Sequence, residues 1–341
     1  AIVNNIPNPQ LRWEKMSHFN VGIDFVTSNK RISGSVEYYL KKGNDLIGDK
    51  PIDPTTGVNQ LRGNFSGMKA HGADIQISTV NIDKNFRWST SFLFNYTNEK
   101  VTRFDLTYTG SDKFTLTAHK GGLPVVGKPL YALYSYRWAG LDPETGDPRI
   151  YLSDTIFKNT TSAVSSQFKL EDHIFNGRYN PPITGSVLNS LSWKNLTLAL
   201  NIVYKLNYVF RRTSIEYTAL RNDWKNGHGD YVLRWKKPGN ETITNVPSFT
   251  YPINATRDTY YSNSDILVEK GDHIRLQFIN VSYQFDEKVL KRSSISSLQV
   301  YFYANNLGLI WRRNDKEIDP DFPTRDYPTP TSYSFGIRCA L

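Results

Sequence analysis

The residue types that most often carry catalysis are present but do not form a catalytic pattern. The sequence has six histidines and a single cysteine, Cys339. No two histidines have HxxxH or HExxH spacing, so neither a histidine metal site nor a histidine-based triad is predicted. Gly63, Gly67 and Gly72 are not followed by Gly-Lys-Ser/Thr, so they do not make a phosphate-binding loop. We therefore predict no enzymatic activity and no cofactor.

One acidic cluster offers a candidate metal site. Asp142, Glu144 and Asp147 lie within the six residues DPETGD, and Ca²⁺ prefers clustered carboxylate oxygens. The same residues also fit a solvated turn, which is the interpretation we favour. Calcium is the one metal hypothesis that the sequence supports.

Binding through aromatic side chains is the activity that the composition favours. The chain has 7 Trp, 21 Tyr and 18 Phe, and aromatic rings stack on sugars or pack against peptide side chains. The alternative for each ring is packing within its own loop or contact with a partner protein. The candidates lie in or beside long loops: Tyr131, Tyr134, Tyr136, Trp138, Trp224, Tyr231, Trp235 and Trp311.

Composition narrows the class of protein that must position these rings. The net charge is +9, but the Lys and Arg residues are scattered and no nucleic-acid motif accompanies them, so nucleic acid is not expected as a partner. No run approaches the roughly 20 apolar residues of a membrane-spanning helix. A membrane protein built of strands stays open, because polar lumen-facing residues lower the mean hydropathy, here −0.49. Ala1 begins neither a charged nor an apolar leader, so we expect a removed targeting segment or a start within a larger protein.

Alternation with period two is the strongest signal in the chain. Phe19, Val21, Ile23 and Phe25 alternate with polar or small residues, as in a half-buried strand. Similar segments run for roughly 9–12 residues, the length of a tilted strand that crosses a bilayer. Many have aromatic residues near their ends, as the girdles of a membrane barrel do. A soluble β-sandwich, propeller or carbohydrate-binding domain is the alternative. Nine segments are clear: 17–26, 31–40, 70–80, 86–97, 183–192, 196–206, 273–285, 298–306 and 332–341.

The connections favour an outer-membrane barrel. Tight turns at 27–30, 81–85 and 193–195 alternate with long loops, as periplasmic turns alternate with extracellular loops. The long loops are expected at 41–69, 98–128, 140–182, 207–272 and 308–331. The connection 286–297 is of intermediate length, and 287–292 could form a helical turn. The phase of 273–285 slips by one residue, which predicts a β-bulge near Phe278 and Ile279.

Parity indicates an incomplete barrel. The segment 131–138 either pairs with a return strand near 149–152 or lies outside the wall, so the chain supplies nine or eleven strands. Bacterial single-chain barrels have even numbers of strands. On this topology Val36 faces lipid and Glu37 faces the lumen. We predict an all-β, antiparallel transmembrane barrel portion with long extracellular loops.

Several short motifs, in order along the chain, resemble the SusC/RagA-type TonB-dependent transporters of Bacteroidota. They are residues 8–15 (NPQLRWEK), 20–25 (NVGIDF), 33–39 (SGSVEYY), 69–75 (KAHGADI), 88–92 (WSTSF), 140–148 (GLDPETGDP), 274–276 (IRL), 281–283 (VSY), 301–307 (YFYANNL) and 332–336 (SYSFG). The resemblance implies that residues 1–341 are the C-terminal 9–11 strands of a 22-stranded plugged barrel. Signal peptide, TonB box and plug are expected to lie outside this sequence.

The resemblance also implies a function and partners. Members import oligosaccharides or oligopeptides across the outer membrane, driven by TonB–ExbB–ExbD, and pair with a SusD-like surface lipoprotein. The further partners would be the plug and remaining strands of the parent, outer-membrane lipid and the substrate. A structural or adhesive surface barrel without active transport is the first alternative, and a soluble glycan-processing β enzyme is the second. The sequence does not separate glycan from peptide as the substrate.

Overall fold

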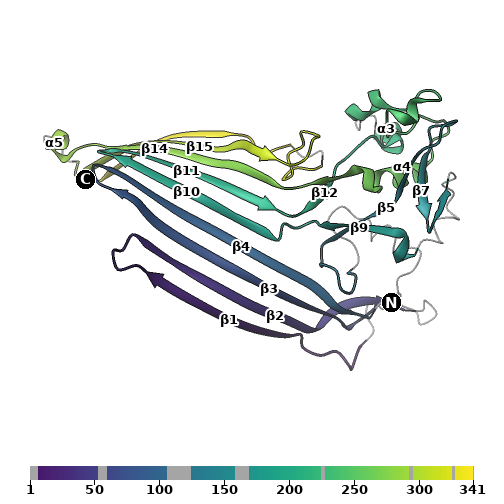
Figure 1. The fold of residues 1–341 in the computed structure, drawn as a ribbon, viewed down its shortest axis with the longest axis horizontal. Coiled ribbons are helices and arrows are strands. Elements are labelled where there is room, and N and C mark those ends of the chain that lie inside the picture. Colours follow the sequence, from purple (N-terminus) through teal and green to yellow (C-terminus); the bar gives the residue numbers. More distant parts are fainter. Residues whose placement is uncertain are drawn as a thin grey trace.

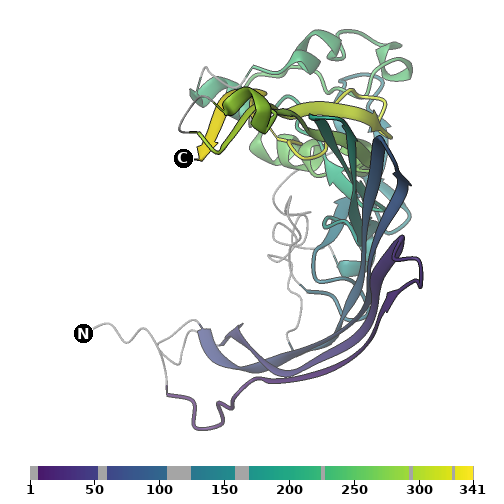
Figure 2. The same cartoon turned by 90° about the vertical axis from the view of Figure 1, so that its left-hand side faces the viewer.

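A nine-stranded antiparallel sheet is the main feature of the computed structural model, which describes residues 7–52, 60–105, 124–157, 169–223, 227–291, 295–324 and 327–340. The strands lie side by side in Figure 1, and Figure 2 shows that the sheet bends into an open C-shaped wall. In spatial order they are β1 (Lys15–Val26), β2 (Ile32–Pro51), β3 (Gln60–Asp83), β4 (Phe86–Phe104), β10 (Ile183–Trp193), β11 (Leu196–Leu206), β14 (His273–Gln284), β15 (Ser297–Arg312) and β16 (Ser332–Ala340).

The sequence alternation becomes two chemically different faces of this wall. Residues paired across neighbouring strands share a face, and Val36 pairs with Ile23 on one side and with Ile75 on the other. The neighbouring Glu37 pairs with Gly22 and Asp74. The shortest central strands, β10 and β11, have 11 residues each, which at about 3.3 Å per residue and a tilt near 45° span about the 25 Å apolar band of an outer-membrane barrel.

Aromatic side chains mark the edges of the apolar face. Phe86 pairs with Trp193, and Leu196 joins Trp193 to Tyr283 in the same row, beside the tight turns. At the other end, Tyr38 and Tyr96 both pair with Ala73. These two rows occupy the positions of the interfacial girdles of a barrel.

The hairpin of β2 and β3 extends well beyond the predicted strand ends. Segment 41–69 was expected to be a long loop, but most of it continues the two strands, which pair from Ile32 with Thr79 to Pro51 with Gln60. Strand β4 likewise continues to Phe104, into the expected loop 98–128. The expectation of loops there was wrong because paired strands above the membrane need no alternation of apolar and polar residues.

The wall has nine strands in the described part of the chain, not eleven. Segment 131–138 does not enter it: β5 (Ala132–Tyr136) pairs with β9 (His173–Arg178), and β6 (Trp138–Leu141) pairs with β7 (Pro148–Leu152). Of segment 131–138, only Trp138 pairs with the return strand predicted at 149–152, through Ile150 of β7. Strand β8 (Thr155–Phe157) joins β7, and β12 (Val209–Arg211) pairs with β13 (Val268–Lys270).

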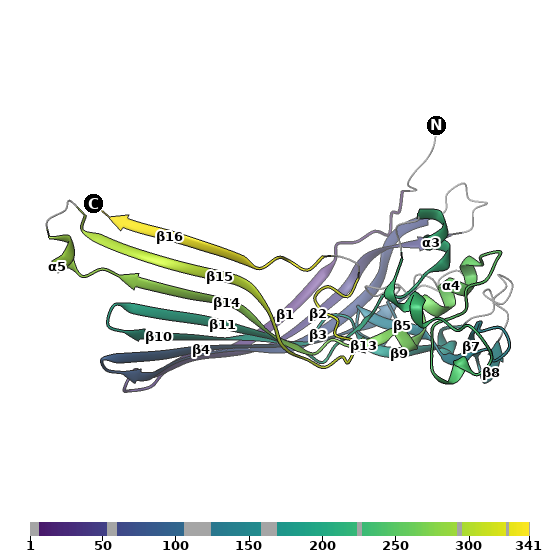
Figure 3. The ribbon, with the colours of Figure 1, turned by 90° about the horizontal axis from the view of Figure 1, so that it is seen from above.

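These small sheets and the helices form a folded cap, which we define as residues 124–157, 169–182, 207–223 and 227–272. It lies at the end of the wall opposite the tight turns, as Figure 3 shows. Three apolar clusters hold it together, centred on Tyr136, Tyr217 and Tyr134. Its helices are α3 (Tyr217–Asp223), α4 (Ala255–Ser262), η3 (Leu170–Asp172), η4 (Gly229–Leu233), η5 (Asn240–Thr242) and η6 (Asp265–Leu267).

The structure tests two local predictions for β14 and the segment after it. The bulge in β14 lies at Gln277, where pairing with both neighbours skips from Leu276 to Phe278, one residue before the predicted position. The expected helical turn after β14 is present as α5 (Glu287–Leu290). Among the described residues, no helix has the length and apolar character needed to cross a membrane.

Candidate functional site

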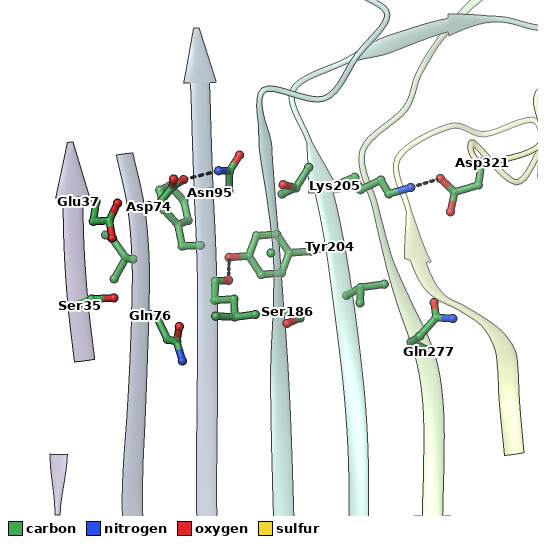
Figure 4. A pocket seen from close by; sticks show the side chains of 16 residues that line it. Ser35, Glu37, Asp74, Gln76, Asn95, Ser186, Tyr204, Lys205, Gln277 and Asp321 are labelled. Carbon is green, nitrogen blue, oxygen red and sulfur yellow. Dashed lines mark hydrogen bonds and ion pairs between the residues drawn. The ribbon is translucent and has the colours of Figure 1, made fainter. Parts of the chain in front are cut away.

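A continuous polar row crosses six strands of the wall near its cap end. Register pairs Glu37 with Asp74, Asp74 with Asn95 and Asn95 with Thr184. It then pairs Thr184 with Lys205, and Lys205 with His273. Figure 4 shows side chains of this row gathered with those of the next row, Ser35, Gln76 and Ser186, around a hollow of about 640 Å³. The row forms a surface rich in hydrogen-bonding groups on the lumen face.

Contacts within the row fix several of these side chains. Asn95 Nδ2 donates a hydrogen bond to Asp74 Oδ1, and Asn20 Nδ2 lies 3.3 Å from Glu37 Oε2. On the apolar face, in the row of Val36 and Ile75, Tyr204 Oη donates across Gly185 to the carbonyl oxygen of Leu93 at 2.9 Å. The arrangement presents carboxylates on β2 and β3, the ammonium group of Lys205 on β11 and the imidazole of His273 on β14. Such a surface can orient a polar solute but lacks a nucleophile paired with a base.

The connection between β15 and β16 folds back onto the cationic end of the row. Asp321 Oδ1 accepts from Lys205 Nζ at 2.7 Å, and its Oδ2 lies 3.3 Å from His273 Nε2. Asp319 receives Arg275 Nη2 on both carboxylate oxygens at 2.6 Å. We call residues 313–324 the acidic strap. It couples the outer rim to Lys205 on β11 and to His273 and Arg275 on β14.

The electrostatics of the strap follow from these contacts. Burial opposes ionisation of Asp321, but the close contact of His273 Nε2 and the hydrogen bond and charge of Lys205 outweigh it, so the pKa of Asp321 lies well below its ordinary value. The carboxylate is therefore ionised throughout the physiological range. A second clasp lies beside it, where Arg313 Nη1 donates to Asp272 Oδ2 at 2.8 Å.

Three of the aromatic candidates lie inside the cap. Tyr134 packs 5.7 Å from the Phe175 ring, and Tyr136 lies 5.1 Å from the Tyr260 ring and is fully buried. Trp235 is buried against Gly146 and donates from Nε1 to Glu241 at 3.1 Å. Their rings stabilise the cap, which is the loop-packing alternative stated for each of them.

Three others retain accessible surface on the cap. Trp138 and Tyr231 both pack against the Tyr217 cluster, so the fold brings them together, and Arg234 stacks 4.0 Å from the centre of the Tyr231 ring. Tyr131 is 44% exposed just before β5. Their role in substrate contact stays a prediction.

The last two candidates lie elsewhere. Trp311 pairs with Ile274, whose other neighbour is Tyr204, in the row that carries apolar side chains. This position places it with the girdle residues rather than at the polar hollow. Trp224 lies outside the described residues.

Asp142 and Asp147 of the DPETGD segment accept hydrogen bonds from protein groups through their carboxylates. Asp142 Oδ1 accepts from the backbone nitrogens of Glu144 and Thr145, each at 3.0 Å, as in a capped turn. Asp147 Oδ1 accepts from Arg257 Nε at 2.5 Å. Within the described residues no group of three or more acidic, histidine or cysteine side chains is arranged to hold a metal ion. The calcium hypothesis therefore gains no support from these contacts.

Sequence reasoning missed the acidic strap and its cations. Lys205 and Asp321 are 116 residues apart, and Arg275 and Asp319 are 44 apart. The polar phase of β11 and β14 could have identified Lys205, His273 and Arg275 as lumen-facing. Nothing local in the sequence shows that the β15–β16 connection turns inward.

Comparisons with known proteins agree with this geometry. No protein-family model matches the chain. The chain is 22% identical to TonB-dependent receptor P26 of Formosa agariphila and 26% identical to TonB-dependent receptor SusC of Bacteroides thetaiotaomicron. Each alignment covers 97% of this chain. These alignments cover 35% and 32% of the two relatives, so the chain spans about a third of the length of the curated proteins it matches. Among solved structures, the RagAB peptide transporter matches with a TM-score of 0.75 and 22% identity, covering 98% of this chain and 36% of that chain.

The fold defines a class. A curved antiparallel sheet with an apolar and a polar face, tight turns at one end and a folded cap at the other is the wall of an outer-membrane β-barrel. Within that class, the likenesses confirm the resemblance to the SusC/RagA-type TonB-dependent transporters. The chain is accordingly an outer-membrane protein, and the proteins that it matches are named as receptors and transporters rather than as enzymes.

Proposed function

We propose that the chain forms part of the barrel of a TonB-dependent importer that takes up oligosaccharides or oligopeptides. The observation that carries the proposal is the alignment of 97% of the chain with named TonB-dependent receptors, SusC among them. The polar row on the lumen face supports it, because a translocated polar solute needs hydrogen-bonding groups along its path. The proposed role of residues 1–341 is to supply nine wall strands and the cap, while the remaining strands, plug and TonB box lie elsewhere in the receptor.

The proposed partner at the outer surface is a SusD-like lipoprotein, with TonB–ExbB–ExbD supplying energy from the inner membrane. The cap supports an outer-surface partner, because it lies at the end of the wall opposite the tight turns and contains the three partly exposed aromatic candidates. Affinity purification of the tagged receptor from a mild-detergent extract should recover a surface lipoprotein in equal amount. Recovery of the receptor without a lipoprotein would contradict the pairing.

Uptake measurements test the transport function and choose the substrate. Cells that express the receptor should accumulate either labelled oligopeptides or labelled oligosaccharides, and accumulation should stop when TonB is deleted. Surface binding that persists unchanged without TonB, with no accumulation, would instead identify the adhesive barrel.

The aromatic candidates can be tested in the same assay. Tyr131→Ala removes an exposed ring, and we expect at least a severalfold higher half-saturating concentration if that ring contacts substrate. Thr197→Ala, at the opposite end of the wall beside a tight turn, is the control. Equal uptake by both variants would remove Tyr131 from the candidates.

A further inference from the structure

Three lysines lie directly opposite one another on the outer face of the wall. Register pairs Lys42 of β2 with Lys69 of β3, and Lys69 with Lys100 of β4. All three side chains are exposed. Like charges in directly opposite positions destabilise a sheet, so a row of three calls for a compensating negative charge.

The described part of the chain does not supply that charge. No carboxylate in it lies within ion-pair distance of these three ammonium groups. The nearest acid along β2, Asp45, is occupied by Arg12 at 3.4 Å and Arg103 at 3.6 Å. Glu99, beside Lys100, is paired with Arg178 at 2.6 Å. The lysine row is therefore a cationic site without an internal partner.

The facing of the row follows from strand parity. Lys42 is separated from Tyr38 and Val36 by even numbers of residues, and Lys69 is separated likewise from Ile75, so both lie on the apolar, lipid-facing side. The row and its neighbours line a hollow of about 510 Å³, whose apolar part comes from Phe19 and Leu40 and whose adjoining ring is His71. The cations are thus continuous with the surface that contacts acyl chains.

The height of the row also fits a membrane surface. Tyr38 and Tyr96 mark the girdle at the cap end, and Lys42 and Lys100 each follow four residues further along their strands. Four residues at about 3.3 Å each, tilted near 45°, rise about 9 Å. The headgroup layer is roughly 5–7 Å thick on each side of the hydrocarbon core. Flexible lysine stems let the ammonium groups reach down into that layer.

We propose that Lys42, Lys69 and Lys100 form a binding site for the phosphate groups of a phosphorylated lipid in the outer leaflet. The lipid's acyl chains would lie on the apolar face around Val36 and Ile75, and its headgroup phosphate would meet the three ammonium groups. Lipid phosphate fits better than an acidic protein segment, because Phe19 of β1 and Leu40 of β2 carry the apolar face up to the hollow. The site anchors the outer-surface edge of β1–β4 in its leaflet.

The test uses the whole receptor in lipid nanodiscs that contain either bisphosphorylated lipid A or its dephosphorylated, acyl-matched form. Bound lipid is counted by native mass spectrometry after detergent transfer. Each lysine near an anionic surface contributes about 1 kcal/mol, so the K42Q/K69Q/K100Q variant should retain the phosphorylated lipid on the order of 100-fold less tightly, and K69Q alone about fivefold less tightly. Lys41 borders the hollow but carries its ammonium group 4.5 Å from the centre of the Tyr39 ring, on the lumen face. The matched control is therefore K41Q, which should bind like the wild type.

Heat-modifiable migration of each variant on a gel verifies that the barrel is folded. If the triple variant does not fold, the single K69Q variant still decides the test. Equal retention of phosphorylated and dephosphorylated lipid by the wild type would overturn the proposal. So would equal loss in K41Q and K69Q. Displacement by inorganic phosphate at a concentration equal to that of the lipid would show a free-anion site and overturn it as well.

Discussion

At the residue scale, the two faces of the wall make opposite demands on side chains. Val36, 41% exposed, lies between Ile23 and Ile75 on the apolar face, while its neighbour Glu37 lies on the polar face. Val36→Arg should cost more folding free energy than Glu37→Gln, but less than the roughly 2–4 kcal/mol of an arginine at the bilayer midplane, because Val36 lies only two residues from the Tyr38 girdle. Urea titration of folding into lipid vesicles measures both. Equal destabilisation by the two would mean that the faces are inverted.

A second residue-scale test concerns a polar group on the apolar face. Asn189 Oδ1 accepts from Trp88 Nε1 at 3.0 Å and from Thr90 Oγ1 at 2.8 Å. Asn189→Leu should destabilise the wall by about 1–3 kcal/mol, because two donors lose their acceptor where water is scarce. The same titration measures this loss. The control is Ser91→Ala, because Ser91 follows Thr90 on β4 and lies on the polar face. An Asn189→Leu variant as stable as that control would show that lipid tolerates the two free donors.

At the element scale, the acidic strap stabilises the outer rim through charge-assisted hydrogen bonds. Asp321→Asn should weaken its contacts with Lys205 and Arg275 by about 1.5–3 kcal/mol and expose residues 313–324 to protease. Glu317→Gln is the matched control, because Glu317 is 87% exposed and lies 3.8 Å from Arg312. Limited proteolysis of intact cells compares the two variants. Equal cleavage of both would show that the strap is not held by Asp321.

The pH dependence of the strap has a definite sign. The pKa of Asp321 is lower in the folded protein than in the unfolded chain, so its contribution to stability is full above the ordinary value near 3.9 and is lost as pH falls below it. Protection of residues 313–324 from protease should therefore stay constant from pH 8 to about pH 5. Loss of protection at about pH 6 would show that a different group controls the strap.

Also at the element scale, the sequence predicts the strands well where contact with lipid imposes alternation of apolar and polar residues. It predicts them less well above the membrane and in the cap. Period two located all nine wall strands, since only one face of each meets lipid. It missed the upper halves of β2 and β3, where Gly63 and Gly67 interrupt any alternation. It left open whether 131–138 pairs with 149–152 or lies outside the wall; the segment lies outside it, and β5 pairs with β9 across a longer connection.

In the candidate site, too, some residues could be predicted from alternation and others could not. Lumen-facing positions such as Glu37 follow from alternation, and their direct pairing with Asp74 follows once the register is known. Burial of Tyr136 in the cap and the inward fold of Asp321 depend on packing between segments far apart in sequence. No local pattern encodes such packing.

At the scale of the whole molecule, both edges of the sheet are open. Strands β1 and β16 each have one paired side, and almost all of their residues are exposed, including Ile23, Phe335 and Ile337. A long apolar edge with unpaired backbone groups is a template for association, and backbone groups in lipid must be satisfied by closure of the barrel. The wall therefore needs further strands against both edges.

This geometry predicts how residues 1–341 behave by themselves. Expressed without the rest of the receptor and refolded into vesicles, they should associate through β1 and β16 into heterogeneous oligomers, whereas the whole receptor should give one heat-modifiable species. Gel migration with and without boiling, together with light scattering in detergent, measures both. Asp24→Pro in β1 and Ser334→Pro in β16 each remove a backbone donor from an edge strand and should reduce the size of the oligomers. A monodisperse, heat-modifiable monomer of 39.1 kDa would contradict the prediction, because it would require the two edges to close on each other.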